Sequence, residues 1–232
     1  MEITLDQDFR KHLLQKIAQR EFRERTGIHQ SDLCFCLNKQ ALRKLHPQDP
    51  EDHELLLYSL GWATQRWLTG QDTDEPEKEV DGITVTLDAI HDVYTPTDHY
   101  RSPWELKATF QSSSRPIEEN IHWVRQIMAQ CYITGTTEAY LSRLEIMGNW
   151  KSIGKKEEKN LPENRKPTLS AYKLTFTQDE LDRNWTWMQD RRDKFVKILV
   201  TRELLPKIEA IPSGQSWECG WCRFREKECS QS

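Results

Sequence analysis

The sequence has no long apolar run. None of its hydrophobic segments approaches the length of a membrane-spanning helix, and its first residues do not form the apolar core of a secretory signal peptide. No segment is repeated along the 232 residues. These absences argue against a membrane protein, a secreted protein and a repeat protein. They predict a soluble, cytoplasmic protein with no membrane partner.

Apolar residues are scarce throughout the chain. Hydrophobic residues make up 36% of the sequence, and the mean hydropathy is −0.81. Nine Trp and seven Phe nevertheless supply bulky material for a core. The length suits one domain. We therefore expect a single domain over residues 1–232, with a helical N-terminal part (1–70), a central core (80–205) and a cysteine-rich C-terminal segment (206–232).

Charge is segregated along the chain, although the net charge is only −4. Residues 10–46 contain nine Lys and Arg against three Asp and Glu, whereas residues 47–105 contain three against fourteen. Residues 148–168 form another basic patch, with six bases against three acids. A basic arm beside an acidic centre is typical of a metal-dependent phosphodiesterase. The alternative is that these charges are ordinary solvated helix faces.

The central stretch of the chain carries the residues with the clearest chemistry. Residues 83–88 alternate as a strand does, a polar break follows at 95–102, and a second short strand contains Glu105 and Lys107. Residues two apart on a strand share a face. If the two strands pair, Asp88 lies beside Glu105. Two carboxylates can hold Mg²⁺ or Mn²⁺, which acidifies a bound water, and a lysine can offset phosphate charge. A solvated strand face is the alternative.

The remaining pattern predicts an α/β fold, in which a mixed central sheet is flanked by helices. Two further strands are expected at residues 139–147 and 169–177. A capping box of Thr177 and Glu180 predicts the start of a long final helix. The expected helices span residues 6–24, 31–45, 51–68, 112–134 and 177–205, and Gly70 and Gly135 are expected to end the third and fourth of them.

The C-terminal segment carries a C-x₂-C-x₆-C array formed by Cys219, Cys222 and Cys229. Three close thiols need a fourth ligand to complete a tetrahedral zinc site or a cubane iron–sulfur cluster. Cys131 falls in the apolar stripe of a predicted helix and is expected to be a buried hydrophobe. The fourth ligand is therefore expected from the Cys34/Cys36 pair, and the spacing does not choose between zinc and a cluster.

A polar row lies on the predicted helix that follows the central strands. His122, Gln126 and Gln130 recur at four-residue spacing, which places them on one helix face. This row is expected either to flank the metal site and contact phosphates or to be solvated.

The ordered set of motifs resembles the iron–sulfur RecB-type exonucleases of the PD-(D/E)XK superfamily, and above all the CRISPR-associated exonucleases of the Cas-four type. The resemblance extends from Ser31 to Cys229. It implies a restriction-endonuclease-like core and an iron–sulfur clasp that joins the N- and C-terminal segments. The segment Ser31-Asp32-Leu33-x-x-Cys36 implies that the [4Fe–4S] ligands are Cys36, Cys219, Cys222 and Cys229, with Cys34 as a spare.

The same resemblance implies roles for the central residues. Asp88 and Glu105 correspond to the metal-binding acids, Lys107 to the catalytic lysine and Gln126 to the motif glutamine. Asp92 replaces Asp88 if the strand carries a bulge. Two positions depart from the family pattern. Gln65 stands where a metal-binding histidine is usual, and Gln130 stands where a tyrosine is usual. We keep Gln65 among the metal ligands and expect weakened or metal-selective activity.

The function implied by the resemblance is a Mn²⁺- or Mg²⁺-dependent DNA exonuclease. Its substrate would be chiefly single-stranded DNA or single-stranded overhangs, and its role would be to trim fragments before their insertion into a CRISPR array. A CRISPR integrase complex and a homo-oligomer are both compatible with such a family. The alternatives are a viral or mobile-element recombination nuclease of the same fold, a catalytically weakened DNA-binding adaptor, and a zinc-stabilised DNA-binding protein.

Overall fold

A four-stranded mixed sheet forms the centre of the molecule. The computed structural model describes residues 4, 6–21, 26–70, 77–109, 116–146, 166–225 and 229. The strand order is β3-β4-β5-β6, and only the β4–β5 pair is parallel. The strands are β3 (Ala89–Tyr94), β4 (His99–Thr109), β5 (Glu138–Glu145) and β6 (Thr168–Thr175). This arrangement confirms the predicted α/β fold with a mixed central sheet flanked by helices.

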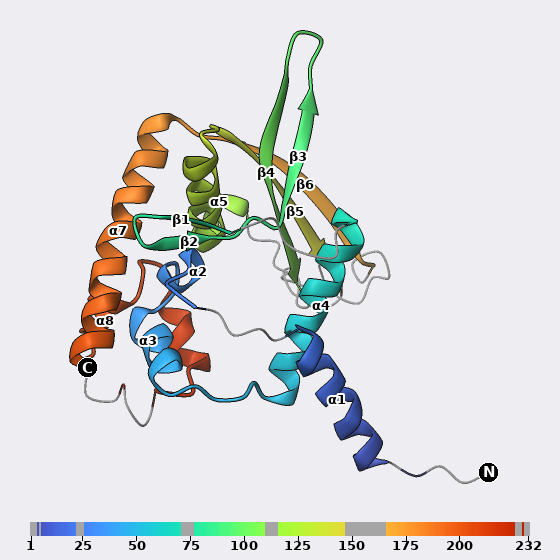
Figure 1. The fold of residues 1–232 in the computed structure, drawn as a ribbon, viewed down its shortest axis with the longest axis vertical. Helices are drawn as coiled ribbons and strands as arrows, with labels where there is room; N and C mark the ends of the chain where they lie inside the picture. The colour runs from blue at the N-terminus through green and yellow to red at the C-terminus, as the bar shows by residue number, and fades with distance from the viewer. Residues whose placement is uncertain are drawn as a thin grey trace, which may run out of the picture.

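Helix α5 (Ile121–Thr134) lies against one face of the sheet, and α7 (Gln178–Thr201) packs against α5 (Figure 1). Helix α5 follows a 3₁₀ turn (Ile117–Glu119) and connects the parallel strands β4 and β5. Its Ile127 and Cys131 pack with Leu141 of the sheet and with Leu181 of α7. Cys131 is buried, as predicted.

The N-terminal part of the chain is helical, as predicted. Its helices are α1 (Gln7–Glu21), α2 (Gln30–Leu33), α3 (Leu37–Leu45) and α4 (Asp52–Thr69). Helix α1 packs against α4, and α2 and α3 pack against α7. No helix among the described residues is long and apolar enough to cross a bilayer.

The prediction of one helix over residues 31–45 was wrong, because the chain leaves the helix between α2 and α3. Cys36 has φ −58° and ψ 115°, which is not helical. Its N–H donates to Glu218, and the carbonyls of Leu33 and Phe35 accept from Arg191. Partners more than 150 residues away in the sequence therefore take the place of local helical hydrogen bonds.

The predicted pairing of the central strands also needs correction. Residues 83–88 do not form one strand. Instead β2 (Ile83–Val85) pairs with β1 (Lys78–Val80) in a separate two-stranded sheet. The antiparallel partner of β4 is β3, a strand that was not predicted from the sequence. The turn occupies residues 95–98 rather than 95–102, so β3 and β4 form a long hairpin that projects beyond the rest of the described chain (Figure 1).

Helix ends follow the predicted capping chemistry. Gly70 and Gly135 end α4 and α5 with φ of 68° and 71°, a backbone conformation that glycine adopts without steric cost. The Thr177–Glu180 capping box opens α7, which ends at Thr201 rather than at residue 205. Helix α5 begins at Ile121, later than predicted. Residues 22–25, 110–115 and 147–165, which include most of the basic patch, lie outside the described residues.

Candidate active site

Strand β4 and helix α5 bring four polar side chains together where the helix packs against the sheet. Glu105 and Lys107 lie two apart on β4, and they form an ion pair. Lys107 Nζ also donates to Gln126 Oε1 at 2.9 Å. Gln130, one helical turn further along α5, donates from Nε2 to Glu105 Oε2 at 2.6 Å. Both glutamines are buried, so the interpretation of this helix face as solvated was wrong.

Asp88, the residue directly before β3, lies beside the same group of side chains. The register pairs Ala89 with Trp104, which sets Asp88 beside Glu105. The backbone N–H of Leu106 donates to Asp88 Oδ2 at 2.8 Å. The predicted convergence of Asp88, Glu105 and Lys107 is therefore present, although β3 and not the strand of residues 83–88 delivers it.

Helix α4 supplies Gln65 to the edge of this group. Gln65 Nε2 donates to the backbone carbonyl of Asp88 at 3.3 Å. The structure thus places Gln65 beside Asp88. Asp92, the alternative to Asp88, lies further out on the hairpin and contacts His99 and Arg101.

The electrostatics of the group favour a charged lysine. Burial opposes the ammonium, but the carboxylates of Glu105 and Asp88 outweigh burial and raise the pKa of Lys107. Burial, with a smaller effect of the Lys107 charge, lowers the pKa of nearby His122 to about 4. At neutral pH the site therefore contains a protonated Lys107 and a neutral His122.

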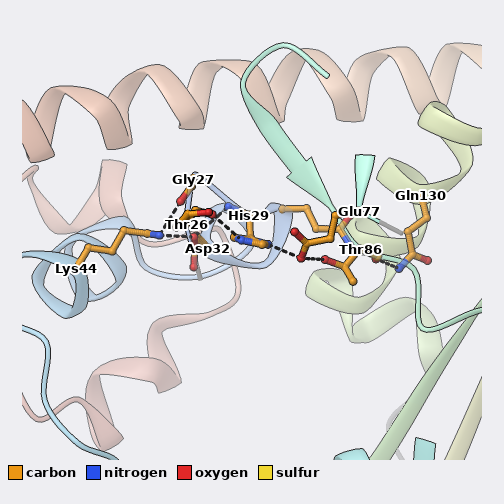
Figure 2. Close-up of polar contacts among 9 residues, drawn as sticks. Thr26, Gly27, His29, Asp32, Lys44, Glu77, Thr86 and Gln130 are labelled. Atoms are coloured by element: carbon orange, nitrogen blue, oxygen red, sulfur yellow. Dashed lines mark hydrogen bonds and ion pairs between the residues drawn. The ribbon is translucent and has the colours of Figure 1, made fainter. Parts of the chain in front are cut away.

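Behind Gln130 lies a polar network that the sequence analysis missed (Figure 2). The carbonyl of Thr86 accepts from Gln130 Nε2 and from Gln30 Nε2, both at 3.1 Å. Thr86 Oγ1 in turn donates to Glu77 at 3.0 Å, and Glu77 lies 3.8 Å from Nδ1 of the buried His29. The Gln130 Nε2 amide therefore donates both to Glu105 and to the Thr86 carbonyl.

The same network continues to the start of α2 and to Lys44 in the last turn of α3 (Figure 2). His29 Nε2 lies 2.9 Å from the carbonyl of Thr26, and the His29 N–H donates to Asp32 at 3.1 Å. Lys44 Nζ donates to the carbonyl of Gly27 at 2.7 Å and lies 3.5 Å from Asp32. These contacts anchor the segment before α2 against α3.

The donor set at Asp88 and Glu105 suits a hard divalent cation, since carboxylate oxygens are the ligands that Mg²⁺ and Mn²⁺ prefer. Among the described residues, however, no group of three or more His, Cys, Asp or Glu is gathered closely enough to hold a metal ion. A cation there would need other oxygen donors, such as Gln65, a backbone carbonyl or water. One further oxygen is buried close by, because Gln130 Oε1 has no hydrogen-bond partner.

Four of the cysteines line a cavity. Cys36 and the C-terminal Cys219, Cys222 and Cys229 line one cavity of about 600 Å³, formed by the start of α3, α8 (Lys207–Ala210) and the 3₁₀ segment Ser216–Trp221. Cys34 is fully buried and does not line the cavity. Burial raises the pKa of Cys36 to about 11 and that of Cys34 to about 12, so both are thiols at neutral pH.

The residues around this cavity fit a thiolate-bound group. Four thiols are the donor set of a [4Fe–4S] cluster or of a zinc site, although here they surround the cavity without converging on one point. Gln215 lies in the loop that lines the cavity, and both polar atoms of its buried side chain lack a hydrogen-bond partner. The buried Arg191 cation lies close enough to Cys34 and Cys36 to interact with their charged forms.

A solved structure shares this fold over most of the chain. The chain is similar in structure to SSO0001, with 16% identity, a TM-score of 0.51 and 93% of each chain covered. The likeness shows the fold and nothing finer. A phage-related exonuclease from Haemophilus somnus 129PT is also similar, with 10% identity and a TM-score of 0.45, over 77% of this chain and 97% of that one. No protein-family model and no curated protein matches the chain.

Proposed function

We propose that this protein is a metal-dependent deoxyribonuclease, an exonuclease that acts chiefly on single-stranded DNA. The observation that carries the proposal is the convergence of Asp88, Glu105 and Lys107, held from behind by Gln126 and Gln130. Two carboxylates beside one ammonium form an arrangement that can bind a cation and a phosphate at once.

The chain's own residues would divide the work of phosphodiester hydrolysis. Asp88 and Glu105, with Gln65 at the edge, would hold Mn²⁺ or Mg²⁺. Such a cation supplies Lewis acidity to water and to a phosphate oxygen. Lys107, kept protonated by the carboxylates, would offset the charge that develops when the water oxygen bonds to phosphorus. The bond from phosphorus to the leaving oxygen would then break; the attacking water would release one proton to solvent, and the leaving oxygen would take up one from solvent.

The four cysteines around the cavity would hold a structural [4Fe–4S] cluster. The ligands would be Cys36, Cys219, Cys222 and Cys229, with Cys34 left as a buried thiol. A cluster bound there would join the N- and C-terminal segments, which already contact each other through Cys36 and Glu218. Zinc is the alternative occupant, because it takes the same four thiolates.

The cellular role follows from the family resemblance alone. We infer a single RecB-like nuclease domain over residues 1–232, in which residues 80–205 are the nuclease core. Its DNA products would serve CRISPR spacer acquisition, either in complex with an integrase or in a homo-oligomer. A viral or mobile-element recombination nuclease would have the same residues, so gene neighbourhood is what separates these two roles.

A catalytically weakened DNA-binding adaptor is the second candidate. The observation that favours it is that both oxygens of the Glu105 carboxylate are engaged, one by Lys107 and the other by Gln130. An adaptor would retain this closed arrangement and would bind DNA without cleaving it.

The deciding experiment measures degradation of end-labelled single-stranded DNA with Mn²⁺ or Mg²⁺, using protein purified without oxygen. Glu105→Ala should lose activity and retain its iron content. Glu138→Ala is the matched control, because Glu138 also pairs with a lysine, Lys173 at 2.7 Å, but lies outside the candidate site. Equal activity of the parent and Glu105→Ala would refute the assigned site. Binding without cleavage by the parent, with iron retained, would support the adaptor.

A further inference from the structure

The tip of the β3–β4 hairpin carries an exposed pair of stacked aromatic rings. Tyr94 and His99 are opposite one another in the register, and their ring centroids lie 4.4 Å apart with an angle of 17° between the planes. Tyr94 is 76% exposed, which is unusual for a large aromatic ring. The ring is held in place and yet its outer surface is open to solvent.

The surroundings of the pair fix its geometry. His99 Nε2 lies 3.1 Å from Asp92 Oδ1, and Arg101 lies 3.8 Å from the same oxygen. The turn is closed by Thr95 and Asp98, which exchange hydrogen bonds of 2.8 and 2.9 Å. The rings are therefore presented on an ordered turn. The Arg101 guanidinium offsets part of the Asp92 charge, so this carboxylate opposes an approaching phosphate less strongly.

The aromatic pair lies on the same face of the hairpin as the candidate active site. Residues directly opposite one another in an antiparallel pair share a face, as do residues two apart along a strand. Counting in twos along β4 from His99 leads to Glu105 and Lys107, and Tyr94 is opposite His99. The face that carries the carboxylate and the lysine thus continues outward to the two rings.

We propose that the Tyr94–His99 pair is a base-stacking platform for single-stranded DNA that occupies the candidate active site. The identity of the ligand rests on the proposed function. Base–aromatic stacking is how proteins hold single strands without reading sequence. From Asp88 to Tyr94 the chain advances six residues, or about 20 Å at ~3.4 Å per residue. No more than about six stacked nucleotides, at ~3.4 Å each, cover that distance.

Binding of a labelled single strand of about 16 nucleotides, measured by fluorescence anisotropy in EDTA, tests the platform without cleavage. Tyr94→Ala should weaken the affinity by about 5- to 30-fold, because a base loses its stacking partner. Tyr94→Phe retains a ring and should bind within about twofold of the parent. Val93→Ala, on the opposite face of the same strand, should bind as the parent does.

An abasic scan separates stacking from a general loss of hairpin structure. One abasic position in the oligonucleotide should weaken binding of the parent as much as Tyr94→Ala does, and the same oligonucleotide should cause no further loss in Tyr94→Ala. Equal affinities of the parent and Tyr94→Ala would overturn the platform, as would losses of equal size for Tyr94→Phe and Tyr94→Ala. A parent that binds no single-stranded DNA would overturn it as well.

Failure of the nuclease proposal gives a different result. Bis(4-nitrophenyl) phosphate is a small phosphodiester that is too short to reach the hairpin tip from the candidate active site. Its hydrolysis should depend on the carboxylates and the lysine alone. The parent and Tyr94→Ala should hydrolyse it at the same rate. The parent could hydrolyse nothing and still bind the abasic oligonucleotide more weakly, with no such loss in Tyr94→Ala. That result would support the stacking platform and refute the nuclease assignment.

Discussion

The substitution Glu105→Gln should lower the stability of the protein by an amount that the structure defines. Its effect follows from the buried ion pair of Glu105 and Lys107, whose side chains are 5% and 21% exposed. Removing one partner of a fully buried pair costs about 3–5 kcal/mol, because the other charge is left without compensation. Water reaches part of Lys107 and reduces that penalty. We therefore expect Glu105→Gln to lower the free energy of unfolding by about 2–3 kcal/mol at pH 7.

The pH dependence of this loss has a defined sign. In the parent, the raised pKa of Lys107 means that the ion pair contributes fully below about pH 10.4, the unfolded value, and is lost as the pH rises through the folded pKa. In Glu105→Gln, the Asp88 carboxylate alone opposes burial, so the pKa of Lys107 should fall below its value in the parent. The deficit of the variant relative to the parent should then shrink as the pH rises through the folded pKa of Lys107.

Urea unfolding followed by circular dichroism at several pH values measures both effects. Asp190→Asn is the matched control, because it breaks the exposed pair of Asp190 and Lys194, which are 2.8 Å apart on α7. That change should cost less than about 0.5 kcal/mol. If Glu105→Gln costs no more than the control, or if its deficit grows with pH, the buried pair does not form as described.

Four further substitutions test other parts of the structure. Cys36→Ser should lose bound iron and visible absorbance, whereas Cys34→Ser should retain both, as measured by iron analysis of anaerobically purified protein; equal losses would contradict the ligand assignment. Arg191→Met should lower the free energy of unfolding by about 3–5 kcal/mol, because four backbone carbonyls lose their donor; urea unfolding of the metal-free proteins measures this, and a change below about 1 kcal/mol would refute it. Gln130→Leu should cost about 2–4 kcal/mol in the same assay, since the Thr86 carbonyl and the Glu105 carboxylate both lose a buried partner.

A pH titration tests the thiol chemistry of the cavity. The pKa of Cys36 is about 11, so binding of Co²⁺ must release its proton, and the apparent affinity should rise about tenfold per pH unit for this thiol near neutral pH. The charge-transfer absorbance of a cobalt–thiolate complex reports the binding. An affinity independent of pH would mean that Cys36 is not a ligand.

Local signals predicted the parts of the fold that depend on local chemistry. Helix ends at Gly70 and Gly135 and the start of α7 at Thr177 were all visible in the sequence, because a cap needs only its own neighbours. The β3 strand was missed since His91 and Asp92 are exposed on a projecting hairpin, where burial imposes no alternation of apolar and polar residues.

The candidate site was predicted better than the strands that build it. Glu105 and Lys107 share a face because of their two-residue spacing, whichever strand is the partner, and the β3–β4 register brings Asp88 beside Glu105. The partners of Gln130 could not be predicted, since Thr86 and Glu105 reach it from segments separated in sequence by 44 and 25 residues. The interruption of the helix at Cys36 could not be predicted either, because its hydrogen-bond partner Glu218 is 182 residues away.

That long separation has a consequence for how the chain is made. Asn38 exchanges two hydrogen bonds with Leu205, at 2.7 and 3.0 Å, and these residues are 167 positions apart. At about 5–20 residues per second, a ribosome needs roughly 10–30 s to synthesise the intervening chain. During that interval the segment around Cys36 has none of its C-terminal partners. We expect it to be the last part of the N-terminal region to become ordered, and hence the part most exposed to oxidation and misassembly in the nascent protein.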